Sequence, residues 1–247
     1  MNKDQDELIW LSQREVLMID DRDYVSKMMQ NDRDFWVPEL ARIFALLLHD
    51  IKDENISDRC KNISQASDIY LKQGFTPMVP LSQLIQASEN LLTDIIKKLN
   101  QGNWLGFIYS TLLENYLAEV KYFKDKMNSV TYNVVEEIQF WNKLIGNFCL
   151  IERQMLNPHQ TKNDQWQHLT GISSGLLDLD FNDSPSTFVL LSYRFTNLLD
   201  TFHHELEISP LHTTMNPQLL SHIIEVTHRS LSFLRTFQLS QDNSYSH

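Results

Sequence analysis

The chain has 247 residues, of which 42% are hydrophobic and 21% are charged, a balance typical of a globular protein with one large or two small domains. Only 6 glycines and 7 prolines are present, too few for the many tight turns of an all-β protein. The formal net charge of −11 argues against nucleic acid as a partner, because phosphate contacts need clustered lysine and arginine.

Apolar residues recur at spacings of three and four along almost the whole chain, which predicts amphipathic helices throughout. Prolines and glycines set the boundaries: Pro38 fits the first turns of a helix, Gly74 fits a helix end, and Asn-Pro and Ser-Pro steps mark breaks. In chain order, the predicted helices are 4–30, 33–52, 56–73, 79–100, 105–128, 131–157, 163–177, 185–207 and 216–238.

The sequence contains a weak internal repeat. Residues 6–19 resemble residues 137–151, residues 108–127 resemble residues 214–237, and the order is the same in each half. Such repetition predicts tandem copies of one supersecondary unit. We therefore expect an all-α fold of two tandem antiparallel four-helix bundles, with one continuous helical array as the alternative. The expected limits are 1–129 for the first bundle, 130–240 for the second and 241–247 for a frayed polar tail.

Two cysteines, Cys60 and Cys149, lie far apart in apolar helical segments, which predicts buried free thiols and no disulfide. The N-terminal segment is polar and acidic, unlike a signal peptide. The longest apolar run, 43–51, is far shorter than the roughly 20 residues of a membrane span. We therefore expect a cytoplasmic protein without a membrane span, although export by an unfamiliar route stays open.

Large apolar side chains suggest both core positions and a surface for a partner. Trp10, Trp36, Trp104 and Trp141 recur on predicted apolar helix faces, which favours core positions. The apolar, proline-flanked segment 76–85 is predicted to be an exposed loop, and a loop of this kind can anchor a protein partner.

Several segments resemble the bacterial family catalogued as domain of unknown function 2935. The match is best at Phe140-Trp141-Asn142, at Leu156-Asn157-Pro158, and from Asn216-Pro217 through Phe233-Leu234. It covers most of the second half of the chain and fragments of the first. The resemblance implies tandem ferritin-like four-helix bundles with metal ions, iron foremost, inside each bundle.

The chain departs from this family at most positions that the resemblance assigns to metal ligands. Asparagine and glutamine are poor replacements for imidazole and carboxylate, and an arginine repels a metal ion in the same pocket. The resemblance thus implies a scaffold that has lost most of its ligands. The positions concerned are Gly146-Asn147 and Gln160, the pair Glu225 and Arg229, and in the first half the pair Asn115 and Glu119.

One cluster retains residues that bind metals. His203 and Glu207 lie four residues apart and share a helix face, so one helix can present both to a metal. With Glu152, His222 or Glu225 from neighbouring helices, they would form a nitrogen and oxygen site suited to iron, manganese or zinc. The alternative is that His203 and Glu207 are solvated polar residues near a helix end.

The chain has no nucleophile elbow, phosphate-binding glycine loop, Cys-x-x-Cys pair or kinase signature. We therefore expect a non-enzymatic interaction or structural protein without a cofactor, which binds a protein partner or itself. Two alternatives remain. One is a ferritin-like metal-binding protein, for storage or oxidase-like chemistry, with its site in the second bundle. The other is a small-ligand binder or metal-independent enzyme that uses the bundle core.

Overall fold

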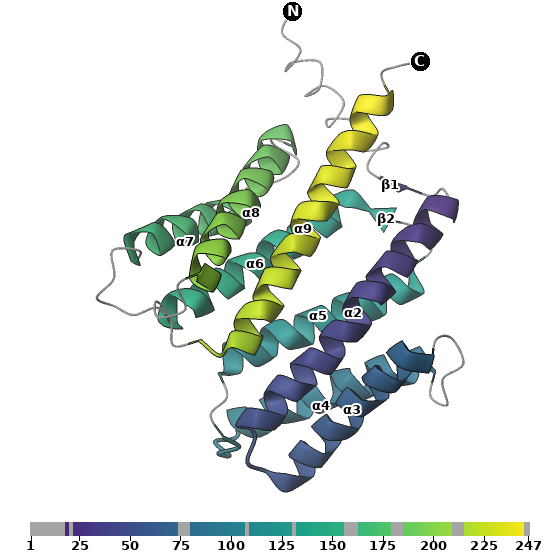
Figure 1. Cartoon of the computed structure of the whole chain (residues 1–247), viewed down its shortest axis with the longest axis vertical. Helices are drawn as coiled ribbons and strands as arrows, with labels where there is room; N and C mark the ends of the chain where they lie inside the picture. The colour runs from purple at the N-terminus through teal and green to yellow at the C-terminus, as the bar shows by residue number, and fades with distance from the viewer. Residues whose placement is uncertain are drawn as a thin grey trace, which may run out of the picture. The chain divides into compact units, whose positions relative to one another are not determined.

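The computed structural model describes residues 18–19, 22–73, 80–106, 109–129, 132–155, 163–178, 185–208 and 215–244. Within these ranges the protein is all-α, with eight helices and one pair of two-residue strands, β1 (Met18–Ile19) and β2 (Tyr132–Asn133) (Figure 1). The helices divide into two compact units, whose boundary lies between Tyr132 and Asn133. β1 groups with the second unit, although the sequence places residues 1–129 together.

The first unit is a four-helix bundle of α2 (Arg22–Asp50), α3 (Glu54–Gln73), α4 (Leu81–Asn100) and α5 (Ser110–Asn128). Each helix packs against the next along the chain, and α5 returns to α2, so the four helices close a ring (Figure 1). The side chain of Asp53 caps α3, because its Oδ1 accepts a hydrogen bond from the Ile56 backbone N–H at 3.0 Å. The connections between successive helices are short, and short connections place neighbouring helices antiparallel.

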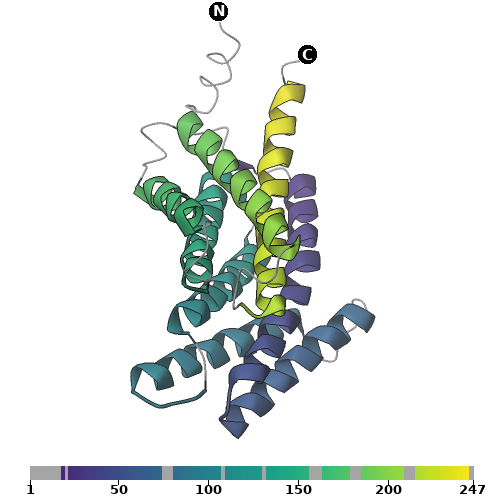
Figure 2. The ribbon, with the colours of Figure 1, turned by 60° about the vertical axis from the view of Figure 1, so that its left-hand side comes forward.

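The second unit repeats this arrangement with α6 (Val134–Met155), α7 (Asn163–Asp178), α8 (Pro185–Ile208) and α9 (Pro217–Ser244). Sequential helices pack together, α9 returns to α6, and α6 also contacts α8 across the diagonal of the bundle (Figure 2). Asparagine side chains cap two of these helices. Asn133 accepts from the Val135 N–H, and Asn216 accepts from the Gln218 N–H. The expected all-α fold of two four-helix bundles is confirmed.

The internal repeat is clearest in the first helix of each bundle. Phe35 and Trp36 pack edge-to-face in α2, with ring centroids 4.8 Å apart, and Phe140 and Trp141 do so in α6 at 5.2 Å. In each helix a buried carboxylate, Asp32 or Glu137, precedes the tryptophan by one turn. The repeat therefore pairs α6 with α2, and not with residues 6–19 as the sequence comparison suggests. The second predicted pairing, of 108–127 with 214–237, matches α5 with α9.

Helix α2 differs most from the sequence prediction. The predicted break between residues 30 and 33 is wrong, because α2 is continuous from Arg22 to Asp50 and contains Pro38 in its interior. Its buried face runs without interruption from Met28 to Leu47, and this packing outweighs the local cost of the proline. Met18–Ile19 is a strand, so the helix predicted over 4–30 is wrong at that point; residues 4–17 lie outside the described residues.

Two predictions near helix ends also need correction. α9 continues to Ser244, into the tail predicted at 241–247, because no proline or glycine follows Pro217 to end the helix. The segment 76–85 is no exposed loop in its described part, since α4 begins at Leu81 and buries Leu84 and Ile85. Residues 76–79 lie outside the described residues.

The tryptophans and cysteines largely follow expectation. Trp36 and Trp141 are each 1% exposed, as predicted, and Cys60 and Cys149 are confirmed as buried free thiols. Trp104, however, is 69% exposed, because α4 ends at Asn100 and the chain turns at Gly102, whose φ is +81°. Trp10 lies outside the described residues.

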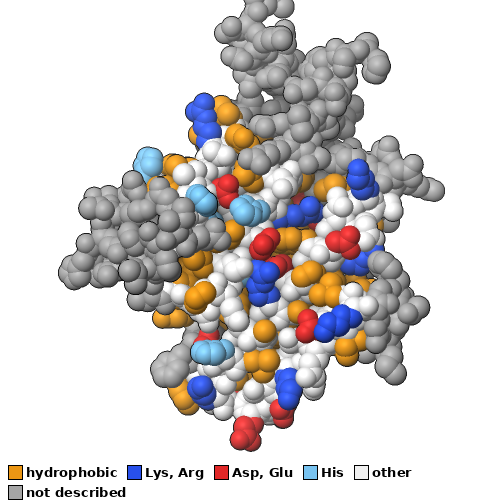
Figure 3. Space-filling view, in the orientation of Figure 1, with side chains coloured by type: hydrophobic (Ala, Val, Ile, Leu, Met, Phe, Trp, Pro, Cys, Tyr) orange, Lys and Arg blue, Asp and Glu red, His pale blue; other side chains and the backbone are white. Residues whose placement is uncertain are grey.

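Charged side chains of both signs lie interspersed over the described residues of the face in Figure 3. Among the helices that the structure describes, none combines the length and the apolar character needed to cross a membrane.

Candidate functional site

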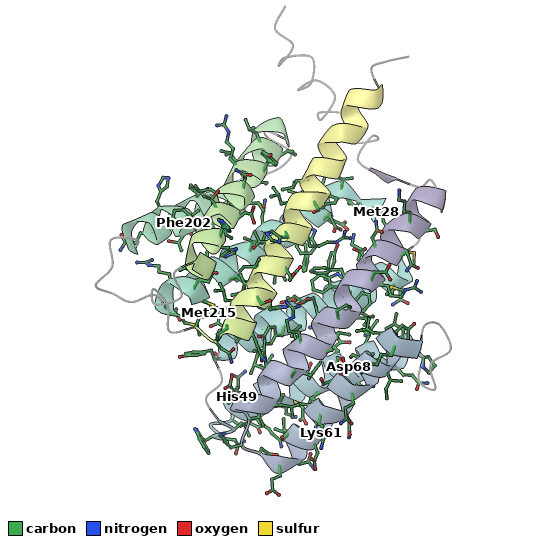
Figure 4. All side chains as sticks on the ribbon, in the orientation of Figure 1. Met28, His49, Lys61, Asp68, Phe202 and Met215 are labelled. Atoms are coloured by element: carbon green, nitrogen blue, oxygen red, sulfur yellow. The ribbon has the colours of Figure 1, made fainter. Side chains whose placement is uncertain are left out.

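Glu152 from α6 and His203 from α8 meet in the core of the second bundle. The imidazole Nε2 lies 2.7 Å from the carboxylate Oε1, and the two side chains are 1% and 0% exposed respectively. Figure 4 labels Phe202, the residue that precedes His203 in α8. The second carboxylate oxygen, Oε2 of Glu152, is buried and has no hydrogen-bond partner among the described residues. A buried carboxylate with one unused oxygen is a group that can bind a further ligand.

The side chains described around this pair are buried and largely apolar. One turn before Glu152, Phe148 and Cys149 are both fully buried on α6. His222 from α9 is also fully buried, and its ring packs edge-on against Phe148, with ring centroids 5.7 Å apart. Such an environment strengthens the hydrogen bond between Glu152 and His203 and makes the loss of either partner costly.

The structure brings two of the five predicted ligands together. Glu152 and His203 are in contact, whereas His222 is buried beside Phe148 and Glu225 is exposed on α9. Glu207 belongs to α8, one turn beyond His203, but its side chain lies outside the described residues. Across the described part of the chain, no group of three or more histidine, cysteine, aspartate or glutamate side chains is arranged to hold a metal ion.

Gly146, one of the positions where the resemblance implies a lost ligand, has a packing role. It is buried on α6, and a Cβ atom built there would lie 2.1 Å from the Oγ of Ser173 on α7. The missing side chain therefore lets α6 and α7 approach each other closely. Gln160 lies outside the described residues, and Arg229 is partly buried on α9.

Sequence reasoning misses two buried polar contacts of α6. The Trp141 Nε1–H donates to Glu137 Oε1 at 2.9 Å, and the Asn142 side-chain amide donates to Ser192 Oγ of α8 at 2.7 Å. The first has a signal in the sequence, since an acidic residue four positions before the tryptophan of a Phe-Trp pair occurs in both halves. The second has none, because it joins residues 50 apart.

The first bundle buries a polar cluster of its own. Glu39 on α2 and Glu119 and Tyr116 on α5 are each 3% exposed or less. Burial, and then the negative charges of Glu119, Asp50 and Glu39, raise the pKa of the Tyr116 hydroxyl well above its usual value. Tyr116 therefore remains protonated across the physiological range. Asn115, which the resemblance pairs with Glu119, is buried on the same helix.

The two thiols are expected to destabilise the fold at alkaline pH. Burial raises the pKa of Cys60 from 9.0 to about 12, against the opposing charge of Arg59. Burial and the negative charge of Glu152 raise the pKa of Cys149 well above its usual value. Thiolate forms more readily in the unfolded chain than in the folded protein. The contribution of the protonated thiols to the free energy of unfolding is therefore complete below pH 9, and it is lost as the pH rises towards the folded pKa.

Urea unfolding from about pH 8 to about pH 11 measures this effect. A Cys60→Ala variant should lose less stability over that range than the wild-type chain. Equal losses in the two proteins would show that ionisation of Cys60 makes no contribution. In the folded protein at neutral pH, neither thiol should react with a thiol reagent, so labelling of Cys60 and of Cys149 reports opening of the first and second bundle separately.

The comparisons with known proteins support the fold and leave the chemistry open. No protein-family model matches the chain. An uncharacterized protein of Acanthamoeba polyphaga mimivirus is 35% identical over 80 residues, which make up 32% of this chain and 25% of that protein. The match thus spans a quarter of that relative's length. The crystal structure of an uncharacterized protein from Bacillus cereus matches with a TM-score of 0.71 over 86% of this chain and 91% of that one, at 13% sequence identity. At this identity the likeness concerns the fold alone.

Proposed function

We propose that this protein is a non-enzymatic helical scaffold, which binds a protein partner or itself and does not depend on a metal. The observation that supports this proposal most directly is the position of the Ser173 side chain, which lies where a side chain at Gly146 would extend. At the position where a metal-binding bundle of the resembled family would place a ligand, there is no side chain, and the Ser173 side chain of α7 lies in the adjacent space. A longer side chain here would overlap the Ser173 hydroxyl unless that hydroxyl moved, so the packing of α6 against α7 fits a glycine and not a ligand side chain at this position.

An exposed aromatic pair supports the interaction part of the proposal. Trp104 and Tyr109, 69% and 56% exposed, both lie in the connection between α4 and α5. Backbone hydrogen bonds hold its start, from the Gly102 N–H to the Leu99 carbonyl and from the Asn103 N–H to the Lys98 carbonyl. Rigid, exposed aromatic side chains are favoured anchors of protein interfaces. Because the chain carries a net charge of −11, a neutral or basic partner surface fits it best.

We further propose that the chain is a divergent relative of the family of domain of unknown function 2935. The Phe-Trp pair at 140–141 and the Asn-Pro step at 216–217 support this kinship, since both have defined places in the second bundle. The all-α fold of two four-helix bundles agrees with it.

A second candidate function is the binding of iron, manganese or zinc in the second bundle. The specific observation in its favour is the Glu152–His203 contact with its unused Oε2, together with Glu207 one turn along α8. Carboxylate and imidazole suit these metals. A protein site for them has three or four protein ligands, and the described side chains supply two, so Glu207 or another residue outside the described side chains would have to complete the set.

Elemental analysis of protein purified without a histidine tag or chelator separates the two candidates. If the scaffold proposal holds, the protein contains much less than one equivalent of metal, and a chelator leaves its melting temperature unchanged. A metal that binds only the folded state would raise the melting temperature, and removal of the metal would lower it.

The matched variants for this experiment are Glu152→Gln and Glu225→Gln. If about one equivalent of iron, manganese or zinc is found and Glu152→Gln removes it while the exposed Glu225→Gln does not, the scaffold proposal is wrong and the second candidate holds. Equal metal contents in the wild type and both variants, together with no effect of the chelator, would leave the scaffold proposal standing.

A further inference from the structure

Because the chain contains two copies of one fold, its helices could assemble in more than one combination. Both bundles close the same ring of four helices in the same order, with a Phe-Trp pair in the first helix of each. A helix from one bundle could therefore pack into the other, or into the equivalent bundle of a second molecule, and bury a similar apolar face. Exchange of equivalent elements is a characteristic failure of repeat proteins, and natural sequences carry features that exclude it.

The first helices of the two bundles can be compared position by position. The register that superposes Phe35-Trp36 on Phe140-Trp141 places Val37 on Asn142 and Leu47 on Glu152. All four of these side chains are buried, so the register also matches the buried faces. Two buried positions are thus apolar in α2 and polar in α6.

The third helices compare in the same way. The register that superposes Ser88 on Ser192, both fully buried, also superposes the apolar core positions Leu91 and Ile95 on Phe195 and Leu199. In this register Leu99 of α4 takes the place of His203 of α8.

The two polar side chains of α6 at these positions each pair with a buried polar side chain of α8, across the diagonal of the second bundle. Asn142 donates to Ser192 at 2.7 Å, and Glu152 and His203 are 2.7 Å apart. In the first bundle, by contrast, Ser88 donates within its own helix to the Leu84 carbonyl. If α8 packed beside α2, His203 would face Leu47 in place of Glu152. That arrangement is unfavourable because the buried His203 imidazole loses its hydrogen bond to Glu152. The buried Glu152 carboxylate loses the same hydrogen bond in a bundle that lacks α8.

We propose that the Glu152–His203 and Asn142–Ser192 pairs determine which helices assemble together, keeping α6 and α8 in one bundle and excluding helix exchange between the repeats or between molecules. This goes beyond the scaffold function, since it explains why these two buried polar pairs occur in the second bundle, whereas Val37 and Leu47 take the matching positions of α2. Removing both members of a buried pair leaves neither of the two groups facing an unpaired partner, so the native bundle tolerates the change while the barrier to exchange disappears.

The test is a refolding experiment on the full chain with the variant Glu152→Leu/His203→Leu, which copies the residues of the first bundle. Protein unfolded in urea is refolded at several protein concentrations, and native mass spectrometry measures its oligomers. We expect at least a several-fold larger fraction of discrete dimer than in the wild type, rising with concentration. The dimer should have native helix content, and both thiols should remain protected. Asn142→Val should shift the distribution in the same direction by a smaller amount, and it decides the question if the double variant does not fold.

The matched control is Arg59→Gln/Asp94→Asn, which removes an equally short ion pair at 2.7 Å whose side chains are each 40% exposed. This control should refold to the wild-type distribution. Two outcomes would overturn the proposal: variants that refold to the wild-type distribution, or an associated fraction in which both thiols react, because the latter reflects unfolding and not exchanged pairing.

Discussion

Replacement of Gly106 by alanine is expected to destabilise the first bundle by about 2–6 kcal/mol, because backbone strain and overpacking act together. Gly106 has φ +139°, and a Cβ atom there would lie 2.0 Å from the backbone oxygen of Asp50. Unlike a side chain, this carbonyl cannot rotate away. It belongs to the junction where Gly106 bridges Ile51 and the Lys52 N–H donates to the Leu105 carbonyl at 2.7 Å. The substitution therefore disrupts the tie between the α2–α3 and α4–α5 connections.

Gly102→Ala is the matched control for this prediction. Gly102 has φ +81°, but no atom lies within 4 Å of its built Cβ, so the substitution adds backbone strain without a clash and should cost about 1–2 kcal/mol. Urea unfolding measures both variants, and labelling of Cys60 shows whether the loss lies in the first bundle. Equal losses in Gly106→Ala and Gly102→Ala would show that contact with the Asp50 carbonyl has no energetic effect.

The helices were largely predictable because their signals are local. The sequence predicts 163–177 and 185–207, and the structure has Asn163–Asp178 and Pro185–Ile208, since apolar periodicity and the Ser184-Pro185 step act within a few residues. The same local reasoning fails at Pro38. It takes the proline as a helix start, although the continuous buried face of α2 holds it inside a long helix. Because the prediction divides α2 into two helices, the sequence comparison does not match Trp36 with Trp141.

The candidate site depends on contacts that no local pattern encodes. Glu152 and His203 are 51 residues apart, and the metal-ligand pattern selects both, but it equally selects Glu225, which is exposed. Which residue of a helix faces the core depends on how neighbouring helices pack, and a shift of one position moves a side chain from the core to the surface. Gly146 shows the same limit, because its role becomes visible only with Ser173 of α7 beside it.

Removal of His203 alone is expected to cost about 3–5 kcal/mol, because it leaves the Glu152 carboxylate in an apolar core with neither oxygen bonded to a described residue. The His203→Ala variant should unfold at a lower urea concentration, and Cys149, one turn from Glu152 on α6, should become reactive at lower urea than in the wild type. Cys60, in the first bundle, should keep its protection. Urea unfolding followed by spectroscopy and by labelling of each thiol measures these effects.

His228→Ala provides a closely matched control. His228 of α9 also lies 2.7 Å from a carboxylate, Asp200 of α8, but its side chain is 53% exposed, so water replaces the lost partner and the cost should be about 0–1 kcal/mol. The double variant Glu152→Leu/His203→Leu should recover most of the stability lost in His203→Ala, since it also removes the buried carboxylate that the single variant leaves without its imidazole partner. If His203→Ala costs no more than His228→Ala, Glu152 must gain another partner when the imidazole is absent. The buried pair would then contribute neither to stability nor to the pairing of α6 with α8.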